Sequence, residues 1–305
     1  MQTSGSFIAL NSYENRVYQI GLVSEKPIIA KFYRPERWTD AAILEEHAFA
    51  LDLQQQEIPI VAPLIVNDQT LHVFKEFRFA IFPSMGGRTF EYGNLEHLAW
   101  MGRFIGRIHS MGAVKPFAHR IKLDTVTYGS TALANIKAGN FVPSHLAEKF
   151  YTLVESCLHM IDQLILLIDP QYIRLHGDFH AGNILWRDEG PHIVDLDDCL
   201  MAPQMQDIWM LLSGEDEKEN QLQLNTILQG YEDFYEFDDR QLRLIEPLRT
   251  LRMIHYSGWL AKRWHDPAFP LSFSWFDTPQ YWASQYHQLM DQAHMLTNLL
   301  NVIAR

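Results

Sequence analysis

Short apolar runs separated by polar turns occupy the first third of the chain, and this pattern predicts β-strands. The expected strands are residues 7–10, 16–20, 28–33, 62–66 and 71–82. Between the third and fourth of these, Thr39 or Asp40 can cap a helix that runs to about residue 55. A polar turn at residues 11–15 joins the first two strands.

Beyond residue 88 the pattern is mainly helical. The expected helices are residues 94–112, 144–168, 204–213, 218–233, 240–264 and 278–303, with short strands at 173–175, 183–186 and 192–194. Segment 83–88 contains a proline, a serine and two glycines, so it is the best linker in the chain. The sequence therefore predicts an α+β fold with a small β-rich lobe at residues 1–84 and a larger helical lobe at residues 85–305.

Composition describes an ordinary globular protein. The chain has 305 residues, of which 47% are hydrophobic and 20% are charged. Its net charge of −12 and the absence of a basic run argue against nucleic-acid binding, which needs Lys and Arg to neutralise phosphates.

The two cysteines, Cys157 and Cys199, form no metal-binding pair by spacing, and we expect them to be buried thiols. No signal peptide is recognisable at the start of the chain, and the apolar patch at residues 164–168 is too short to span a bilayer. We therefore expect a cytoplasmic protein that neither enters a membrane nor binds nucleic acid.

The most informative stretch, residues 175–186, contains His-Gly-Asp-x-His-x-x-Asn and is followed by Val-Asp-Leu-Asp-Asp at residues 194–198. The motif thus contains Asp178, Asn183 five residues later and Asp195 twelve residues after that. Phosphoryl transfer from ATP requires this set of side chains. One carboxylate accepts the proton of an attacking hydroxyl, while an amide oxygen and a second carboxylate hold magnesium on the phosphates.

Each of these residues has a simpler interpretation when it is taken alone. Asp178 and Asn183 could be turn or capping residues, but their spacing within the motif favours catalysis for Asp178 and metal binding for Asn183. Asp195 follows an apolar strand and is the first choice for the magnesium carboxylate. Asp197 is the second choice, because alternation in an extended segment would put it on the same face as Asp195.

Three further residues near the motif have structural explanations. His176 and His180 are four positions apart, but the neighbouring glycines exclude the helix of a zinc-protease motif, so we expect both to be hydrogen-bonding scaffold residues. Asp207 begins a helix, where a negative charge is favourable, and it can also accept backbone N–H groups of the motif loop.

Lys31 lies in an apolar strand and needs a partner. In the helix that follows, Glu46 shares a face with apolar residues at i+3, i+4 and i+7 and so points inward, whereas the face of Glu45 fits solvent better. The sequence therefore predicts a Lys31–Glu46 pair in which Lys31 contacts the α- and β-phosphates of ATP. The turn at residues 11–15 lies where a kinase has its phosphate-covering loop. It has no glycine, but its N–H groups and Ser12 can still contact phosphate.

Taken together, these residues resemble the aminoglycoside-phosphotransferase and choline-kinase-like superfamily, which has a two-lobed protein-kinase-like fold. The resemblance extends over essentially the whole chain. A closer resemblance, to the bacterial stress response kinases, rests on residues 10–19, 31–38, 175–188 and 207–212. That family consists of Mg-ATP-dependent serine/threonine protein kinases.

This resemblance implies a function for each site residue. Asp178 is the proton acceptor, Asn183 and Asp195 bind magnesium, and Ser12, Lys31 and Glu46 belong to the ATP-binding lobe at residues 1–84. The expected protein is a monomeric, autophosphorylating serine/threonine kinase of the stress response, with Mg²⁺ as cofactor and a protein substrate. The alternative is a kinase of an amino alcohol or an aminoglycoside-like hydroxyl, because it needs the same catalytic residues. Intact motifs argue against a nucleotide-binding module without activity.

Overall fold

The computed structural model describes residues 1–303, which divide into two compact units. Unit 1 comprises Met1–Ile121 and Tyr172–Phe237, and unit 2 comprises Lys122–Gln171 and Asp238–Arg305. Strands and helices are both abundant, and this confirms the predicted α+β class. The lobe boundary predicted near residues 83–88 is a different division of the chain and stays a prediction.

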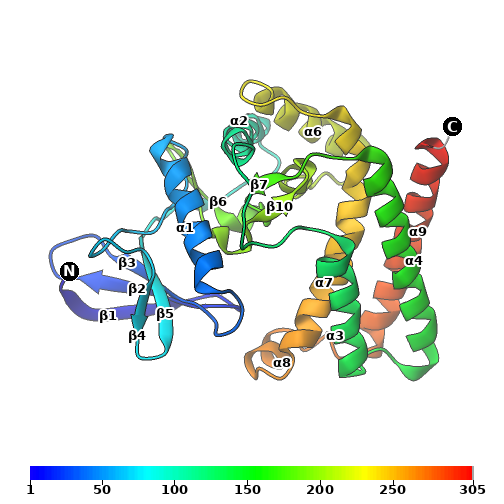
Figure 1. The fold of residues 1–305 in the computed structure, drawn as a ribbon, viewed down its shortest axis with the longest axis horizontal. Helices are drawn as coiled ribbons and strands as arrows, with labels where there is room; N and C mark the ends of the chain where they lie inside the picture. Colours follow the sequence, from blue (N-terminus) through cyan, green and yellow to red (C-terminus); the bar gives the residue numbers. More distant parts are fainter. Residues whose placement is uncertain (304–305) are drawn as a thin grey trace. The chain divides into compact units, whose positions relative to one another are not determined.

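Unit 1 begins with an antiparallel sheet in the order β1-β2-β3-β5-β4 (Figure 1). Its strands are β1 (Thr3–Leu10), β2 (Arg16–Leu22), β3 (Ile28–Phe32), β4 (His72–Phe74) and β5 (Phe77–Pro83). Alternate residues of a strand face the same side, so Lys31 faces the same side as Tyr33. Tyr33 packs there in a small core with Ile43 and Ala80, and Ala80 is the pairing partner of Lys31 in β5. Register therefore directs Lys31 to the helix-covered side of the sheet.

Helix α1 (Asp40–Gln55) covers that side. Thr39, one of the two caps that the sequence allowed, is the N-cap, and its hydroxyl accepts a hydrogen bond from the Ala42 amide at 3.2 Å. Glu46 lies on the buried face together with Phe49 and Leu53. The helical phase therefore carries the Glu46 carboxylate to the buried face of the helix.

The rest of unit 1 consists of helices and small sheets. The helices are α2 (Leu95–Gly112), α5 (Met205–Trp209) and α6 (Glu217–Tyr231), with short 3₁₀ turns η2 (Ala181–Asn183) and η3 (Leu196–Asp198). The strands are β6 (Arg88–Thr89), β7 (Ile173–Leu175), β8 (Ile184–Arg187), β9 (Gly190–Ile193) and β10 (Leu200–Ala202), paired as β6-β8-β9 and β10-β7. In the β8–β9 hairpin, Ile184 pairs with Ile193, so the residues just outside this pair meet at one end.

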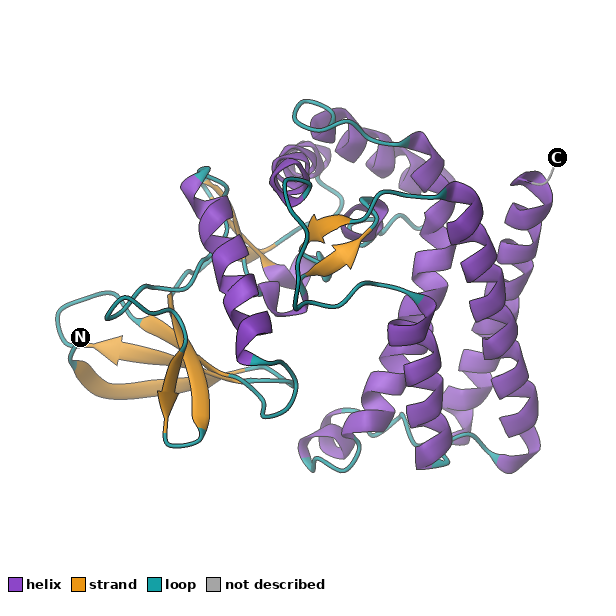
Figure 2. Ribbon diagram, in the orientation of Figure 1, coloured by secondary structure: helices purple, strands orange, loops and turns teal. Residues whose placement is uncertain are grey.

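Unit 2 is helical among its described residues (Figure 2). It contains η1 (Thr125–Ser130), α3 (Thr131–Gly139), α4 (Ser144–Ile168), η4 (Asp239–Leu244), α7 (Ile245–Arg263), α8 (Ala268–Ser272) and α9 (Pro279–Ile303). Helix α3 packs against α7, and α4 packs against α9. Trp282 of α9 is fully buried among aromatic rings, including Phe150 and Phe276.

Two strand predictions were wrong in detail. Residues 62–66 form no strand, because Pro63 has no N–H and the flanking amides pair with different segments: Val61 with Ile193 and Leu64 with Ile81. Residues 71–82 form a hairpin, β4 and β5, in place of one strand. Helix α5 is shorter than the predicted 204–213, and α3, α8 and β10 were not predicted.

Helix α4 has 25 residues and a mean hydropathy of 1.4 over its most apolar 18-residue window. By length and composition alone it could cross a membrane, whereas the patch at residues 164–168 considered by itself is too short. Core helices of soluble proteins can have the same length and hydropathy.

Candidate active site

Lys31 lies at the centre of a group of carboxylates. Its Nζ is 2.9 Å from Asp195 Oδ1, 3.0 Å from Asp197 Oδ1 and 3.6 Å from Glu46 Oε1. The contact with Glu46 confirms the pair predicted from helical phase. The segment that contains Asp195 lies more than 160 positions later in the chain, so folding of unit 1 joins the strand, the helix and the later loop at one ammonium group.

Burial and charge act in opposite directions on these groups. Burial alone would lower the pKa of Lys31, but the neighbouring Asp195, Asp197 and Glu46 raise it well above its ordinary value. Burial raises the pKa of Glu46 to about 7, against the opposing effect of Lys31. Lys31 therefore stays charged, and its two aspartate partners supply the compensating negative charge.

The two aspartates differ strongly in exposure. The Asp195 side chain is 53% exposed, whereas that of Asp197 is 2% exposed. Burial opposes ionisation of Asp197, but Lys31, Arg37 and Arg120 outweigh it and hold the pKa of Asp197 well below its usual range. Asp197 is therefore a buried ionic partner, while Asp195 is open to a ligand.

The predicted alternation at this segment was wrong. Asp195 has a left-handed backbone with φ of 61° and precedes the 3₁₀ turn η3, so residues 195–198 are not extended. Both carboxylates nevertheless reach Lys31, because the tight turn brings them to the same side. Asp198 instead pairs with Arg37 at 2.6 Å.

Asp178 lies in the loop between β7 and η2. The two histidines around it act as scaffold: His176 Nε2 is 2.9 Å from the Val194 carbonyl oxygen and its Nδ1 accepts from the Asp178 amide, while His180 Nε2 is 3.3 Å from Asp178 Oδ2. His180 Nδ1 also accepts from the Gly182 amide at 2.9 Å. These contacts confirm the predicted hydrogen-bonding function of both histidines.

Gly177 permits this loop geometry. Its φ is +86°, and a Cβ added there would collide with the Asp198 carbonyl oxygen. A side chain at this position would therefore both strain the backbone and separate the loop of Asp178 from the loop of Asp195.

The Asp207 carboxylate binds the backbone of the motif loop through two hydrogen bonds. Its Oδ2 accepts from the His176 amide at 2.9 Å and its Oδ1 accepts from the Gly177 amide at 2.8 Å. His109 Nε2 lies 3.2 Å from Oδ2, and both side chains are fully buried. The predicted acceptance of loop N–H groups is thus confirmed, and it places Asp207 as an anchor of the backbone that carries Asp178.

Replacing Asp207 by alanine is expected to lower the free energy of unfolding by about 2–6 kcal/mol, since two buried N–H donors lose their acceptor. Urea unfolding of the variant and the parent protein measures this loss. Asp216→Ala is the matched control, because Asp216 caps α6 near the surface through the Glu219 amide, and its loss should cost only about 1 kcal/mol. Equal losses in the two variants would contradict the anchoring role.

The β8–β9 hairpin sets Asn183 opposite Val194, the residue that precedes Asp195. Its carbonyl oxygen accepts from the Val194 amide at 3.0 Å, and its side-chain Nδ2 donates to the Asp178 carbonyl oxygen at 2.9 Å. The carboxamide is therefore held at its nitrogen, and its oxygen is the atom suited to a cation.

Among the described residues, no group of three or more His, Cys, Asp or Glu side chains gathers as a metal site. One amide oxygen and one half-exposed carboxylate fit Mg²⁺, which draws its other ligands from phosphate and water.

Ser12 lies in the turn between β1 and β2, where its hydroxyl accepts from the Asn15 amide at 3.3 Å.

The environment of Glu45 differs from the one that the sequence predicted. It was predicted to face solvent, but its carboxylate accepts from the amides of residues 118, 119 and 120 at 2.7–3.1 Å. Helix α1 therefore carries Glu46 to Lys31 and the preceding Glu45 to a distant loop.

Comparison with known proteins identifies the family. The model of the phosphotransferase enzyme family matches residues 6–245. The chain belongs to this family. Stress response kinase A of Escherichia coli K12 is 45% identical to this phosphotransferase over 293 residues, which cover 94% of this chain and 87% of the relative. Serine/threonine protein kinase RdoA of Salmonella typhimurium LT2 is 44% identical over 287 residues, with the same coverage.

Solved structures share the fold of this phosphotransferase. An amicoumacin kinase in complex with AMP-PNP, Ca²⁺ and its ligand has a TM-score of 0.70 at 19% identity, covering 90% of this chain and 88% of the other. A microcompartment-associated aminopropanol kinase has a TM-score of 0.70 at 16% identity, covering 98% of this chain and 93% of the other. At such low identity the likeness establishes the two-lobed kinase-like fold alone.

Sequence reasoning missed two arginines that complete the ionic cluster of this phosphotransferase. The Arg37 guanidinium contacts the carboxylates of Asp197 and Asp198. Arg120 donates to the carbonyl oxygens of Asp197 and Cys199, and it stacks 3.9 Å above the Trp38 ring. The three aspartates within residues 195–198 could have indicated these arginines, because several buried carboxylates require cations nearby.

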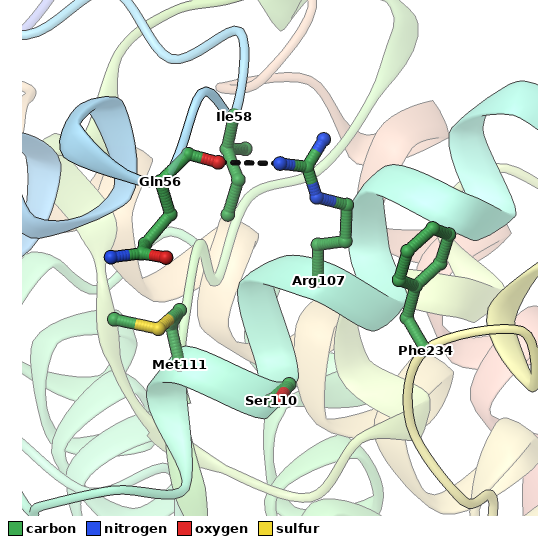
Figure 3. Close-up of a pocket in the computed structure, with 6 residues that line it drawn as sticks. All are labelled: Gln56, Ile58, Arg107, Ser110, Met111 and Phe234. Atoms are coloured by element: carbon green, nitrogen blue, oxygen red, sulfur yellow. Dashed lines mark hydrogen bonds between the residues drawn. The ribbon is translucent and has the colours of Figure 1, made fainter.

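A separate cavity of about 150 Å³ opens near the C-terminal end of α1 (Figure 3). Its lining residues are Gln56, Ile58, Arg107, Ser110, Met111 and Phe234. Arg107 donates to the Gln56 carbonyl oxygen, and its guanidinium lies 5.8 Å from the centre of the Phe234 ring. This volume is below the roughly 300 Å³ at which drug-sized ligand pockets begin, and none of the residues with predicted catalytic or metal-binding functions lines it.

Proposed function

We propose that this phosphotransferase is a Mg-ATP-dependent serine/threonine protein kinase that also phosphorylates itself. The observation that carries the proposal is the 44–45% identity, across 94% of the chain, to proteins named as a stress response kinase and a serine/threonine protein kinase. The proposal is supported by the positions of the Glu46 and Asp195 carboxylates, which both contact the Lys31 ammonium group. We further place the protein in the cytoplasm as a monomer that acts in the stress response.

Asp178 has the central chemical task in this proposal. The acceptor hydroxyl oxygen attacks the γ-phosphorus, the bond from that phosphorus to the bridging oxygen breaks, and ADP leaves. Asp178 orients the hydroxyl and takes its proton. Because the transition state is loose, proton transfer comes late and positioning matters more than base strength.

Five other residues serve nucleotide binding in this proposal. Asn183 and Asp195 would bind magnesium, which when bound neutralises charge on the phosphates. Lys31 would contact the α- and β-phosphates, with Glu46 fixing its orientation. Ser12 lies in the turn that would cover the phosphates.

The second candidate is a small-molecule kinase. The solved structures with the same fold are named for small acceptors such as amicoumacin and aminopropanol, and the catalytic residues would be shared. Only the acceptor distinguishes the two reactions.

Incubation with γ-labelled ATP and Mg²⁺ separates the candidates. The protein is incubated alone, with a panel of bacterial proteins, and with amino alcohols and aminoglycosides. Label in phosphoserine or phosphothreonine is expected, with little label in small molecules, and Asp178→Asn is the control for a contaminating kinase. Efficient labelling of an amino alcohol with no labelled protein would overturn the protein-kinase proposal in favour of the second candidate.

A further inference from the structure

Arg34 makes two hydrogen bonds to the backbone of the turn between β1 and β2, whereas the contact of Arg37 with this turn is to the Glu14 carboxylate, at 3.8 Å. Arg34 follows β3, and its guanidinium donates to two backbone carbonyl oxygens of the turn: Nε to Glu14 at 2.9 Å and Nη2 to Tyr13 at 3.0 Å. The Glu14 carboxylate lies 3.3 Å from the same Nε. A guanidinium presents its donors in a fixed planar fork, whereas the three donors of an ammonium group rotate freely.

Asn15 fixes the other end of the turn. Its side chain is buried, with the residue 4% exposed. Its Oδ1 accepts from the Arg34 amide at 3.2 Å, and its Nδ2 donates to Asp197 Oδ2 at 3.1 Å. The other oxygen of Asp197 contacts Lys31 at 3.0 Å. One carboxylate therefore joins the turn to the lysine proposed to bind phosphate.

This arrangement compensates for the absence of glycine. Phosphate-covering loops of kinases are rich in glycine, so their backbone N–H groups can approach the phosphates closely. Residues 11–15 include no glycine, so the turn must be held in its conformation by contacts. Arg34 engages carbonyl dipoles that would repel an anion, and it places a positive charge beside the turn.

We propose that Arg34 is a positioning residue for the nucleotide, which holds the glycine-free turn so that Ser12 and the turn amides face the phosphates. The inference rests on the proposed function only in requiring ATP as the phosphoryl donor. It does not depend on whether the acceptor is a protein or a small molecule. Asn15 transmits the position of the turn to Asp197 and so to Lys31.

Nucleotide affinity of Arg34→Gln tests the proposal without any acceptor. Titration with Mg²⁺ and a non-hydrolysable ATP analogue should show a dissociation constant about tenfold higher than that of the parent protein, the loss expected for one charge-assisted contact. In steady-state assays KM for ATP should rise by a similar factor while kcat changes less than about threefold, because Arg34 does not touch the reacting atoms. Hydrogen exchange at the amides of residues 11–15 should become faster.

Two more variants complete the test. Arg34→Lys keeps the charge but lacks the planar fork, so it should also bind the nucleotide weakly, and it serves if Arg34→Gln fails to fold. Arg16→Gln removes an exposed positive charge one residue after the turn and should stay within about twofold of the parent. Unchanged nucleotide affinity in both Arg34 variants, or an equal loss in Arg16→Gln, would overturn the positioning role. A parent protein that binds no nucleotide would instead refute the proposed kinase function.

Discussion

Asp178→Asn is expected to lower the rate of phosphoryl transfer at least about a hundredfold while nucleotide binding is retained, because a positioned base typically contributes 10²–10⁴-fold. The asparagine has the same size, and the loop contacts made by the backbone of this residue are retained. The Asp178 amide bonds His176, and its carbonyl oxygen accepts from the Asn183 side chain. Measurement of kcat, together with titration of the ATP analogue, separates chemistry from binding.

Asp188→Asn is the matched control for this variant. Asp188 lies in the β8–β9 turn, and its side chain is fully exposed, so the same loss of a negative charge near the motif should leave kcat unchanged. If Asp178→Asn had a kcat close to that of the parent, the assignment of Asp178 as the base would be wrong. If Asp188→Asn were equally slow, the effect would come from local charge and not from proton acceptance.

Asp195→Ala is expected to abolish the dependence of nucleotide binding on divalent metal, with the apparent affinity for Mg-ATP falling at least about a hundredfold. Loss of a group that only supports a metal ligand already costs 10–100-fold in metal affinity, and loss of the ligand itself should cost more. The fold should survive, because Lys31 keeps Asp197 at 3.0 Å and Glu46 at 3.6 Å. Nucleotide titrations at several magnesium concentrations measure the effect.

Asp197→Asn should give the opposite result. Its carboxylate is buried against Lys31 and Arg37, so the variant should keep magnesium dependence but lose a few kcal/mol of stability through uncompensated buried charge. Magnesium titration curves of Asp195→Ala that overlay those of the parent would refute the assignment of Asp195. Loss of metal dependence in Asp197→Asn alone would transfer the metal site to Asp197.

Helical phase could be predicted from the sequence because it depends on local spacing. The phase of α1 placed Glu46 inward, which the structure confirms, and of the two expected caps, Thr39 and Asp40, the structure selects Thr39. The function of Asp207 was also predicted correctly, although its partners His176 and Gly177 lie some thirty positions earlier, because its helix follows the motif segment closely enough to accept the loop N–H groups. Glu45 failed, because its partners belong to a loop some seventy positions later.

The sequence by itself determined the α+β class, the capped helix and the order of Asp178, Asn183 and Asp195 along the chain, because short-range spacing and residue chemistry set them. Only the tertiary structure decided that Asp195 stays exposed while Asp197 is buried between Lys31 and Arg37. It likewise placed Arg34 on the turn at residues 11–15. The reason is that burial and ionic pairing depend on which distant segments meet. Three carboxylates within four positions look equivalent until the fold brings cations to some of them and leaves solvent to another.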